Sequence, residues 1–251
     1  MSKITENRTR LFALLFAMTF PTLAAWSYFL ALAGSQDKPN IGQQSAYVAG
    51  KIVQFAFPLL FLAVVERQVP SFRSASQKTL TPSLHYGLAF GLLVVMLMLG
   101  TYFGVLRNTE MLRQTPAQLQ QKLREFNMAT PIRYGVLAGF IVTVHSLLEE
   151  YYWRWFVFGQ LRQLTTQVPA LALSSLAFMA HHMVVLYVYL PGNFWTAAVP
   201  FSLAIAIGGA VWAWLYERSG SLVPSWLSHL LIDAGIFVIG WDLLWPLGGR
   251  D

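Results

Sequence analysis

Seven long apolar segments constrain this chain more than any other feature. A helix needs about 20 residues to cross the hydrocarbon core of a bilayer, which is about 30 Å thick. Segments of this length follow one another along the chain, separated by proline, glycine and charged residues. They are residues 11–32, 46–65, 84–106, 132–148, 169–190, 194–216 and 222–244. The sequence therefore predicts an all-α, polytopic bundle of about seven transmembrane helices in a single domain.

The composition excludes several other classes of protein. Charged residues make up 11% of the chain, against roughly 25% in an ordinary soluble domain. The absence of cysteine excludes disulfides, cysteine-ligated metals and a cysteine nucleophile. The net charge of +6 is spread over the connections and forms no basic block, so the expected partner is the lipid bilayer and not a nucleic acid.

The distribution of basic residues predicts an N-terminus in the cytoplasm. Three basic residues lie within residues 3–10, and three more, Arg67, Arg73 and Lys78, lie in the second connection. The third connection carries five basic residues and disagrees with this orientation. An amphipathic helix on the membrane surface, with Thr115 as its N-cap and Pro116 in its first turn, would explain that connection.

The first apolar segment allows two interpretations. Basic residues precede it, and Ala31-Leu32-Ala33 is a plausible cleavage site, as in a signal peptide. Its length of about 20 residues exceeds the 7–15 of a signal sequence, which favours a retained span.

Ionisable residues gather in the second half of the chain. Because such residues are costly inside a membrane, they indicate function by default. The set is His145, Glu149, Glu150, Arg154, His181, His182, His229 and Asp233. The first half offers only Lys51 and His85, near the ends of apolar segments, where snorkelling is a sufficient explanation.

The first of three motifs is Glu149-Glu150-x-x-x-Arg154. Glu150 and Arg154 are four residues apart and share a helix face, so we expect an ion pair. Glu149 points about 100° away and is left to bind a proton, a metal or a water. The alternative is that all three charges cap a span at the membrane interface.

The second and third motifs supply histidines. His181 and His182 are adjacent and point in different directions, so we expect only His182 to reach Glu149. His229 and Asp233 are four apart on one face and form either a metal or proton-relay pair or a simple buried hydrogen bond.

Together, Glu-Glu-x-x-x-Arg, Phe-x-x-x-His (Phe178 to His182) and His-x-x-x-Asp resemble the signature motifs of the CAAX protease and bacteriocin-processing family, also called the Abi family. The resemblance divides the chain into residues 1–130, which carry no recognised motif, and a catalytic core of residues 131–247. It implies an intramembrane metalloendopeptidase of the bacterial plasma membrane. The implied substrate is a membrane-associated or lipidated protein or peptide.

The resemblance also implies roles for individual residues. The catalytic set is Glu149, Glu150, His182, His229 and Asp233, with Arg154 and Phe178 in support. A divalent metal such as zinc would be held by His182 and His229. Glu149 is the expected general base, and Glu150 and Arg154 form a supporting pair, unless Arg154 binds a substrate carboxylate.

Asp233 departs from the commoner asparagine of the third motif. An asparagine can donate a hydrogen bond to an oxyanion, whereas an ionised aspartate cannot. Asp233 is therefore a protonated oxyanion donor, a metal ligand or a support for His229.

Two other functions remain possible on this sequence. One is a catalytically silent family member that acts as a membrane scaffold or immunity protein. The other is a proton-coupled transporter, against which the absence of matching motifs in the first three segments argues.

Overall fold

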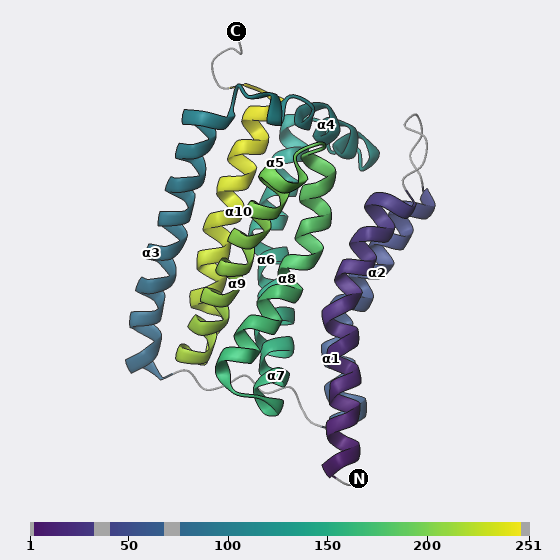
Figure 1. The fold of residues 1–251 in the computed structure, drawn as a ribbon, viewed down its shortest axis with the longest axis vertical. Helices are drawn as coiled ribbons and strands as arrows, with labels where there is room; N and C mark the ends of the chain where they lie inside the picture. The colour runs from purple at the N-terminus through teal and green to yellow at the C-terminus, as the bar shows by residue number, and fades with distance from the viewer. Residues whose placement is uncertain (1–2, 33–40, 68–75, 247–251) are drawn as a thin grey trace.

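The computed structural model describes residues 3–32, 41–67 and 76–246 (Figure 1). Ala33 of the possible cleavage site, Arg73 and the final residue of the predicted core lie outside these ranges. The described residues form no strand. The α-helices are α1 (Lys3–Trp26), α2 (Ile41–Leu60), α3 (Gln77–Thr101), α4 (Thr115–Glu125), α5 (Pro131–Phe140), α6 (Ser146–Glu150), α7 (Gly159–Leu164), α8 (Gln167–Tyr189), α9 (Val199–Ser219) and α10 (Val223–Leu244).

Shorter helical turns extend or join these helices. The π-helical turns are η1 (Ser27–Ala31), η2 (Phe61–Glu66), η3 (Tyr102–Leu106), η5 (Ile141–His145), η6 (Tyr151–Phe158) and η7 (Phe194–Ala198), and η4 (Glu110–Leu112) is a 3-10 turn. Seven continuous helical segments are long and apolar enough to cross a membrane. They are Asn7–Ala31, Ile41–Glu66, Gln77–Leu106, Pro131–Leu164, Gln167–Tyr189, Phe194–Ser219 and Val223–Leu244. The predicted all-α bundle of seven spans is confirmed, and the chain is a multi-pass integral membrane protein.

The fourth span differs most from its prediction. We expected it to end at residue 148, before the two glutamates, but the helix runs without a break from Pro131 to Leu164, over 34 residues. Hydropathy stopped the prediction early because it counts each carboxylate as unpaired. In the structure, Glu150 pairs with Arg154 inside the bundle. Both glutamates therefore lie within the span and not at its end.

Close packing of small residues joins α3 to α10. Ser83, Gly87 and Gly91 recur every four residues on α3 and are buried. A Cβ on Gly87 would collide with the Pro224 carbonyl oxygen, and one on Gly91 would lie 3.1 Å from the Ser228 carbonyl oxygen. Small residues at such an interface let helix backbones approach closely in a membrane. The third span is thus part of the same bundle as the motif-bearing helices, although it carries no motif itself.

The first two spans lie at the opposite edge of the bundle from α3 (Figure 1). Leu14 and Ala17 of α1 enter the main apolar core. The Tyr152 hydroxyl donates a hydrogen bond of 2.7 Å to the Ala17 carbonyl oxygen. This packing against η6 is what a retained first span requires.

Helix α4 lies across one end of the bundle (Figure 1). Its apolar face packs inward, since Leu123 is 6% exposed and the Phe126 ring that follows the helix contacts the Tyr28 ring at 6.1 Å. The predicted role of Thr115 as N-cap is wrong. Thr115 is the first residue of the helix, and its hydroxyl instead donates to the Tyr189 carbonyl oxygen at 2.9 Å.

Candidate active site

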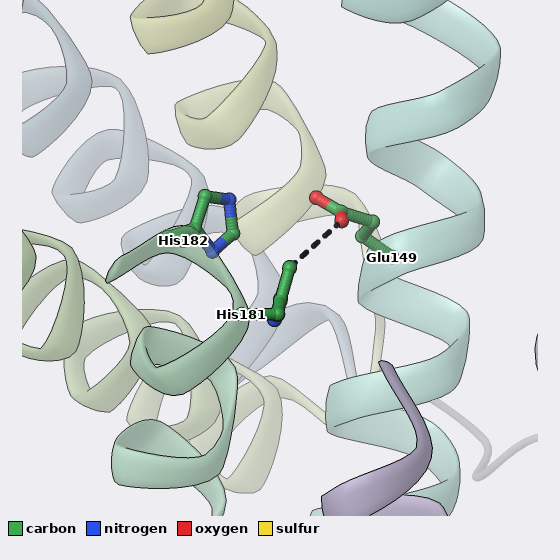
Figure 2. A group of neighbouring side chains, drawn as sticks. All are labelled: Glu149, His181 and His182. Atoms are coloured by element: carbon green, nitrogen blue, oxygen red, sulfur yellow. Dashed lines mark ion pairs between the residues drawn. The ribbon is translucent and has the colours of Figure 1, made fainter. Parts of the chain in front are cut away.

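Three helices bring the motif residues together inside the bundle. Glu149 and Glu150 come from α6, the two histidines from α8, and His229 and Asp233 from α10. Figure 2 shows Glu149 facing the two α8 histidines. The cluster is largely shielded from solvent, because Glu149 is 4% exposed and His229 is 3% exposed. The three motifs therefore form one site.

The Glu149 carboxylate is shared between the histidines of two helices. Its Oε1 atom lies 3.6 Å from His181 Nε2, and its Oε2 atom lies 3.7 Å from His229 Nε2. One donor atom each of Glu149, His181 and His182 lie within 4.8 Å of one another. All these separations are longer than a direct hydrogen bond. The arrangement leaves the carboxylate oriented but not directly bonded to these rings.

The prediction that His181 points away from Glu149 is wrong. Successive helix positions diverge by about 100°, but the Glu149 carboxylate lies between the two directions, so both imidazoles reach it. Their ring centroids are 4.0 Å apart. His181 is 6% exposed and lies parallel to the Trp153 ring at 5.6 Å.

Backbone carbonyl groups orient the histidines of α8. His182 Nδ1 lies 2.9 Å from the Phe178 carbonyl oxygen. Because a carbonyl oxygen only accepts, Nδ1 carries the hydrogen and Nε2 keeps its lone pair. His181 has the Ala177 carbonyl oxygen nearby, but in the described part of the chain neither of its ring nitrogens makes a hydrogen bond of good geometry. The lone pairs of this histidine pair are therefore available to a ligand.

Glu150 links the site to a buried cation. Its Oε1 atom accepts a hydrogen bond of 2.9 Å from His229 Nδ1, and its Oε2 atom lies 3.3 Å from Arg154 Nε. The Arg154 guanidinium packs against the rings of Phe178 at 4.6 Å and Trp212 at 4.9 Å. This chain of contacts fixes the orientation of the His229 ring, which also stacks on Trp212 at 4.2 Å.

The buried position of Arg154 excludes one interpretation of the first motif. Arg154 is 1% exposed and Glu150 is 0% exposed. The charges therefore do not cap a span at the membrane interface. Arg154 packs beside Glu150 and two aromatic rings, and its guanidinium nitrogens make no hydrogen bond of good geometry among the described residues.

Asp233 shares the face of His229, as its spacing predicts. Its Oδ1 atom lies 3.6 Å from His229 Nε2, and its side chain is 15% exposed. Phe178 occupies the space between the histidines and Arg154, with its ring centroid 4.5 Å from that of His182. Neither Asp233 nor His229 belongs to the group that Glu149 forms with the α8 histidines.

The donors of that group fit a divalent metal. Two imidazoles and one carboxylate are a common ligand set for catalytic zinc, and donors at about 2.1 Å from a tetrahedral zinc lie about 3.4 Å apart. The 3.6 Å between His181 Nε2 and Glu149 Oε1 is close to that spacing. The bond from His182 Nδ1 to a backbone carbonyl is the usual support of a ligating histidine. A buried imidazole without hydrogen bonds, such as His181, is otherwise unfavourable.

Lys51 is a site residue that the sequence analysis misjudged. It lies in the interior of the second span, Ile41–Glu66, so the explanation by snorkelling from a span end is wrong. The apolar segment was started at residue 46, which placed Lys51 too near its end. Its charge interacts with those of Glu149, His145 and His181. A polar stripe at helical spacing on α2, Gln43, Tyr47, Lys51 and Gln54, is the signal that could have revealed it.

Comparison with known proteins agrees with the motifs. Residues 131–235 match the family model described as "Type II CAAX prenyl endopeptidase Rce1-like". The match covers all three motifs, so this segment is similar to the family that the motifs resemble. The description of that family model is of a protease. Neither the curated proteins nor the solved structures contain a significant match to the chain.

Proposed function

We propose that the protein is an intramembrane endopeptidase that hydrolyses a peptide bond of a membrane-associated or lipidated protein or peptide. The observation that carries this proposal is the buried Glu149 carboxylate, which lies among histidines of α8 and α10 in a segment of a protease family. Amide hydrolysis needs a base for water, a donor for the leaving amine and a stabiliser for the oxyanion, and the site holds a candidate for each.

Glu149 is the proposed general base. Its two oxygens lie more than 3.5 Å from the nearest imidazole nitrogens, which is compatible with a water bridging between them. His182 accepts a hydrogen bond from that water through Nε2 and so orients it. Glu149 takes one proton as the oxygen of the water bonds to the scissile carbonyl carbon, and then gives that proton to the leaving nitrogen.

His229 and Asp233 are the proposed stabilisers of the oxyanion. Glu150 holds His229 through Nδ1 at 2.9 Å, so Nε2 points toward Glu149 and Asp233. In its protonated form, His229 can donate from Nε2, and a protonated Asp233 can donate from its carboxyl group. Glu150, Arg154 and Phe178 act by positioning His229 and the histidines of α8.

We further propose that Glu149, His181 and His182 can hold a divalent cation, zinc. With the cation bound, the lone pair of His182 Nε2 and one oxygen of Glu149 would be its ligands, and His182 would no longer orient the water itself. When bound, such a cation lowers the pKa of a coordinated water to about 7 and polarises a carbonyl oxygen. The motif-based expectation named His182 and His229 as metal ligands. The proposed set retains His182 but replaces His229 with His181, because His229 lies outside the group of donors.

The orientation remains the one that the basic residues predict. We propose that the N-terminus lies in the cytoplasm, in a bacterial plasma membrane. The Arg10 guanidinium at the start of the first span pairs with Glu66 at the end of the second, at 2.7 Å. These two ends therefore share one side of the membrane, as two consecutive spans require.

A cleavage assay tests the proposal. The purified protein in lipid nanodiscs is incubated with a farnesylated peptide ending in a CAAX sequence and with the same peptide lacking the lipid, and the products are identified by mass spectrometry. We expect the wild-type protein to cleave and the Glu149→Gln variant to lose that activity. His85, which is exposed on α3, supplies the matched control His85→Gln. Equal cleavage by the wild type and Glu149→Gln would refute the proposed role of the site.

A further inference from the structure

We propose that Lys51 is a specificity-determining residue that binds a carboxylate of the substrate close to the scissile bond. This inference rests on the proposed function, because it assumes that a peptide lies at Glu149. It differs from the motif-based expectation, which offered this role to Arg154 as the alternative to its pair with Glu150. It also places a substrate-binding residue on a span that carries no family motif.

One face of α2 holds Lys51 in place. Its Nζ atom donates a hydrogen bond of 3.3 Å to Gln54 Oε1. The ammonium also lies over two rings of the same face, at 5.9 Å from the Tyr47 centroid and 5.5 Å from the Phe55 centroid. These positions are three or four residues apart, so they form a continuous surface on one side of the helix. Lys51 is therefore a positioned cation and not a flexible side chain reaching for water.

That face is directed at the active site. The Phe55 ring makes an edge contact with the His145 ring at 5.9 Å, one helical turn before Glu149. The Tyr151 hydroxyl, two residues after Glu149, donates to the Phe55 carbonyl oxygen at 3.4 Å. These contacts flank Glu149 on both sides along the fourth span. A peptide held at Glu149 would then have the Lys51 ammonium within a few residues of its scissile bond.

Lys51 makes no direct ion pair with a carboxylate among the described residues, although its charge interacts with that of Glu149 at longer range. Three arginines that reach into the bundle, Arg154, Arg107 and Arg10, are paired with Glu150, Asp242 and Glu66 at 3.3, 2.9 and 2.7 Å. Within the described ranges Lys51 forms no such ion pair, and an ammonium has three donors, of which Gln54 takes one. The amide nitrogen of Gln54, a residue that is 2% exposed, also lacks a hydrogen-bond partner there. The remaining N–H groups of Lys51 and the amide nitrogen of Gln54, beside a peptide-hydrolysing site, favour an anionic group on the substrate.

A carboxylate on a peptide comes from its C-terminus or from an Asp or Glu side chain. The test uses three farnesylated peptides of one sequence: one with a C-terminal acid, one with a C-terminal carboxamide, and one with a carboxamide and an aspartate next to the scissile bond. Binding is measured in nanodiscs by fluorescence anisotropy, on protein carrying Glu149→Gln, so that cleavage does not intervene. Lys51→Met and Lys51→Arg are compared in this background, with Lys78→Met, on an exposed lysine, as the matched control.

We expect at least one carboxylate-bearing peptide to bind about tenfold to hundredfold more tightly than the plain carboxamide, as for a charged hydrogen bond. Lys51→Met should abolish this preference, whereas Lys51→Arg and Lys78→Met should keep it. The peptide that shows the preference identifies the source of the carboxylate. Where Lys51→Met does not fold, Lys51→Gln replaces it.

Two results would overturn the assignment. One is equal binding of all three peptides to protein with an intact Lys51. The other is a loss of the same size for all three in Lys51→Met, which would mean that Lys51 acts on the folding or the shape of the site and not on a substrate carboxylate. Failure of the proposed function looks different, because the wild-type protein would then bind the peptides without cleaving any of them.

Discussion

Two buried carboxylate clusters to which α10 contributes residues differ in how completely their hydrogen bonds are satisfied. Asp242 is 0% exposed and accepts from the Tyr102 hydroxyl at 2.7 Å and from Arg107 Nε and a terminal nitrogen at 2.9 Å each. The site around Glu149 contains longer separations and several buried polar atoms without a hydrogen-bond partner among the described residues. The hydrogen bonds of the Asp242 cluster are satisfied within the protein, whereas the Glu149 cluster has donors and acceptors left for a ligand.

The difference teaches how to separate structural from functional charge inside this membrane protein. Hydrogen bonding to Asp242 raises the pKa of the Arg107 guanidinium, just beyond the third span, and ties α3 to α10. Buried polar groups in native proteins nearly always find partners, so a cluster that does not is a candidate for binding or catalysis. The following experiments test that division, beginning with the largest expected effect.

Glu149→Gln should abolish peptide cleavage at the Glu149 cluster and leave the fold intact. We expect a loss of cleavage of about hundredfold to ten-thousandfold, the usual contribution of a general base. Because no direct hydrogen bond to Glu149 is lost, the thermal unfolding midpoint should stay close to that of the wild type. Both quantities are measured on the same nanodisc preparation, and a large fall in the midpoint would instead make Glu149 structural.

Asp242→Ala should lower the stability of the protein and leave its cleavage activity intact. It removes the hydrogen bonds that the Tyr102 hydroxyl and Arg107 donate to this buried carboxylate, which is destabilising because the buried hydroxyl loses its acceptor. We expect a lower unfolding midpoint but unchanged cleavage per folded molecule. A selective loss of activity at unchanged stability would contradict the structural role of this cluster.

His181→Gln tests whether the Glu149 cluster holds a metal. We expect zinc, measured by elemental analysis after dialysis, to fall from about one per chain to a trace, with an affinity loss above the roughly hundredfold limit seen for supporting residues. His229→Gln is the control and should keep its zinc. Wild-type protein that cleaves fully after chelation and contains no zinc would exclude the metal and leave the protease proposal standing.

Asp233→Asn should have the smallest effect, because an asparagine can also donate to an oxyanion. We expect cleavage to stay within about tenfold of the wild type, the change worth about 1.4 kcal/mol. A loss above about hundredfold, roughly 2.7 kcal/mol, with the protein still folded, would assign Asp233 to the support of His229, from which it lies 3.6 Å away.

The sequence by itself determined the elements and the local pairs. Bilayer thickness fixes the length of a spanning helix, so the seven spans could be located from hydropathy, and positions four apart must share a face. That rule correctly placed Glu150 beside Arg154 and Asp233 beside His229. The three motifs also lie in the segment that the family model matches.

Only the tertiary structure decided which side chains from different helices meet. Helical spacing fixes the angle between the His181 and His182 side chains, but it does not say where α6 lies relative to them. The prediction therefore wrongly excluded His181 from contact with Glu149. Hydropathy scores each charge alone, so it ended the fourth span early and dismissed Lys51. The hydrogen bond from Arg107 to Asp242, two residues that are 135 positions apart in the sequence, likewise depends on how α3 packs on α10. In a membrane the hydrophobic effect does not favour one helix neighbour over another, because lipid tails are as apolar as the side chains. Helix packing depends instead on contacts between small and polar residues of different segments, which the sequence of one segment does not specify.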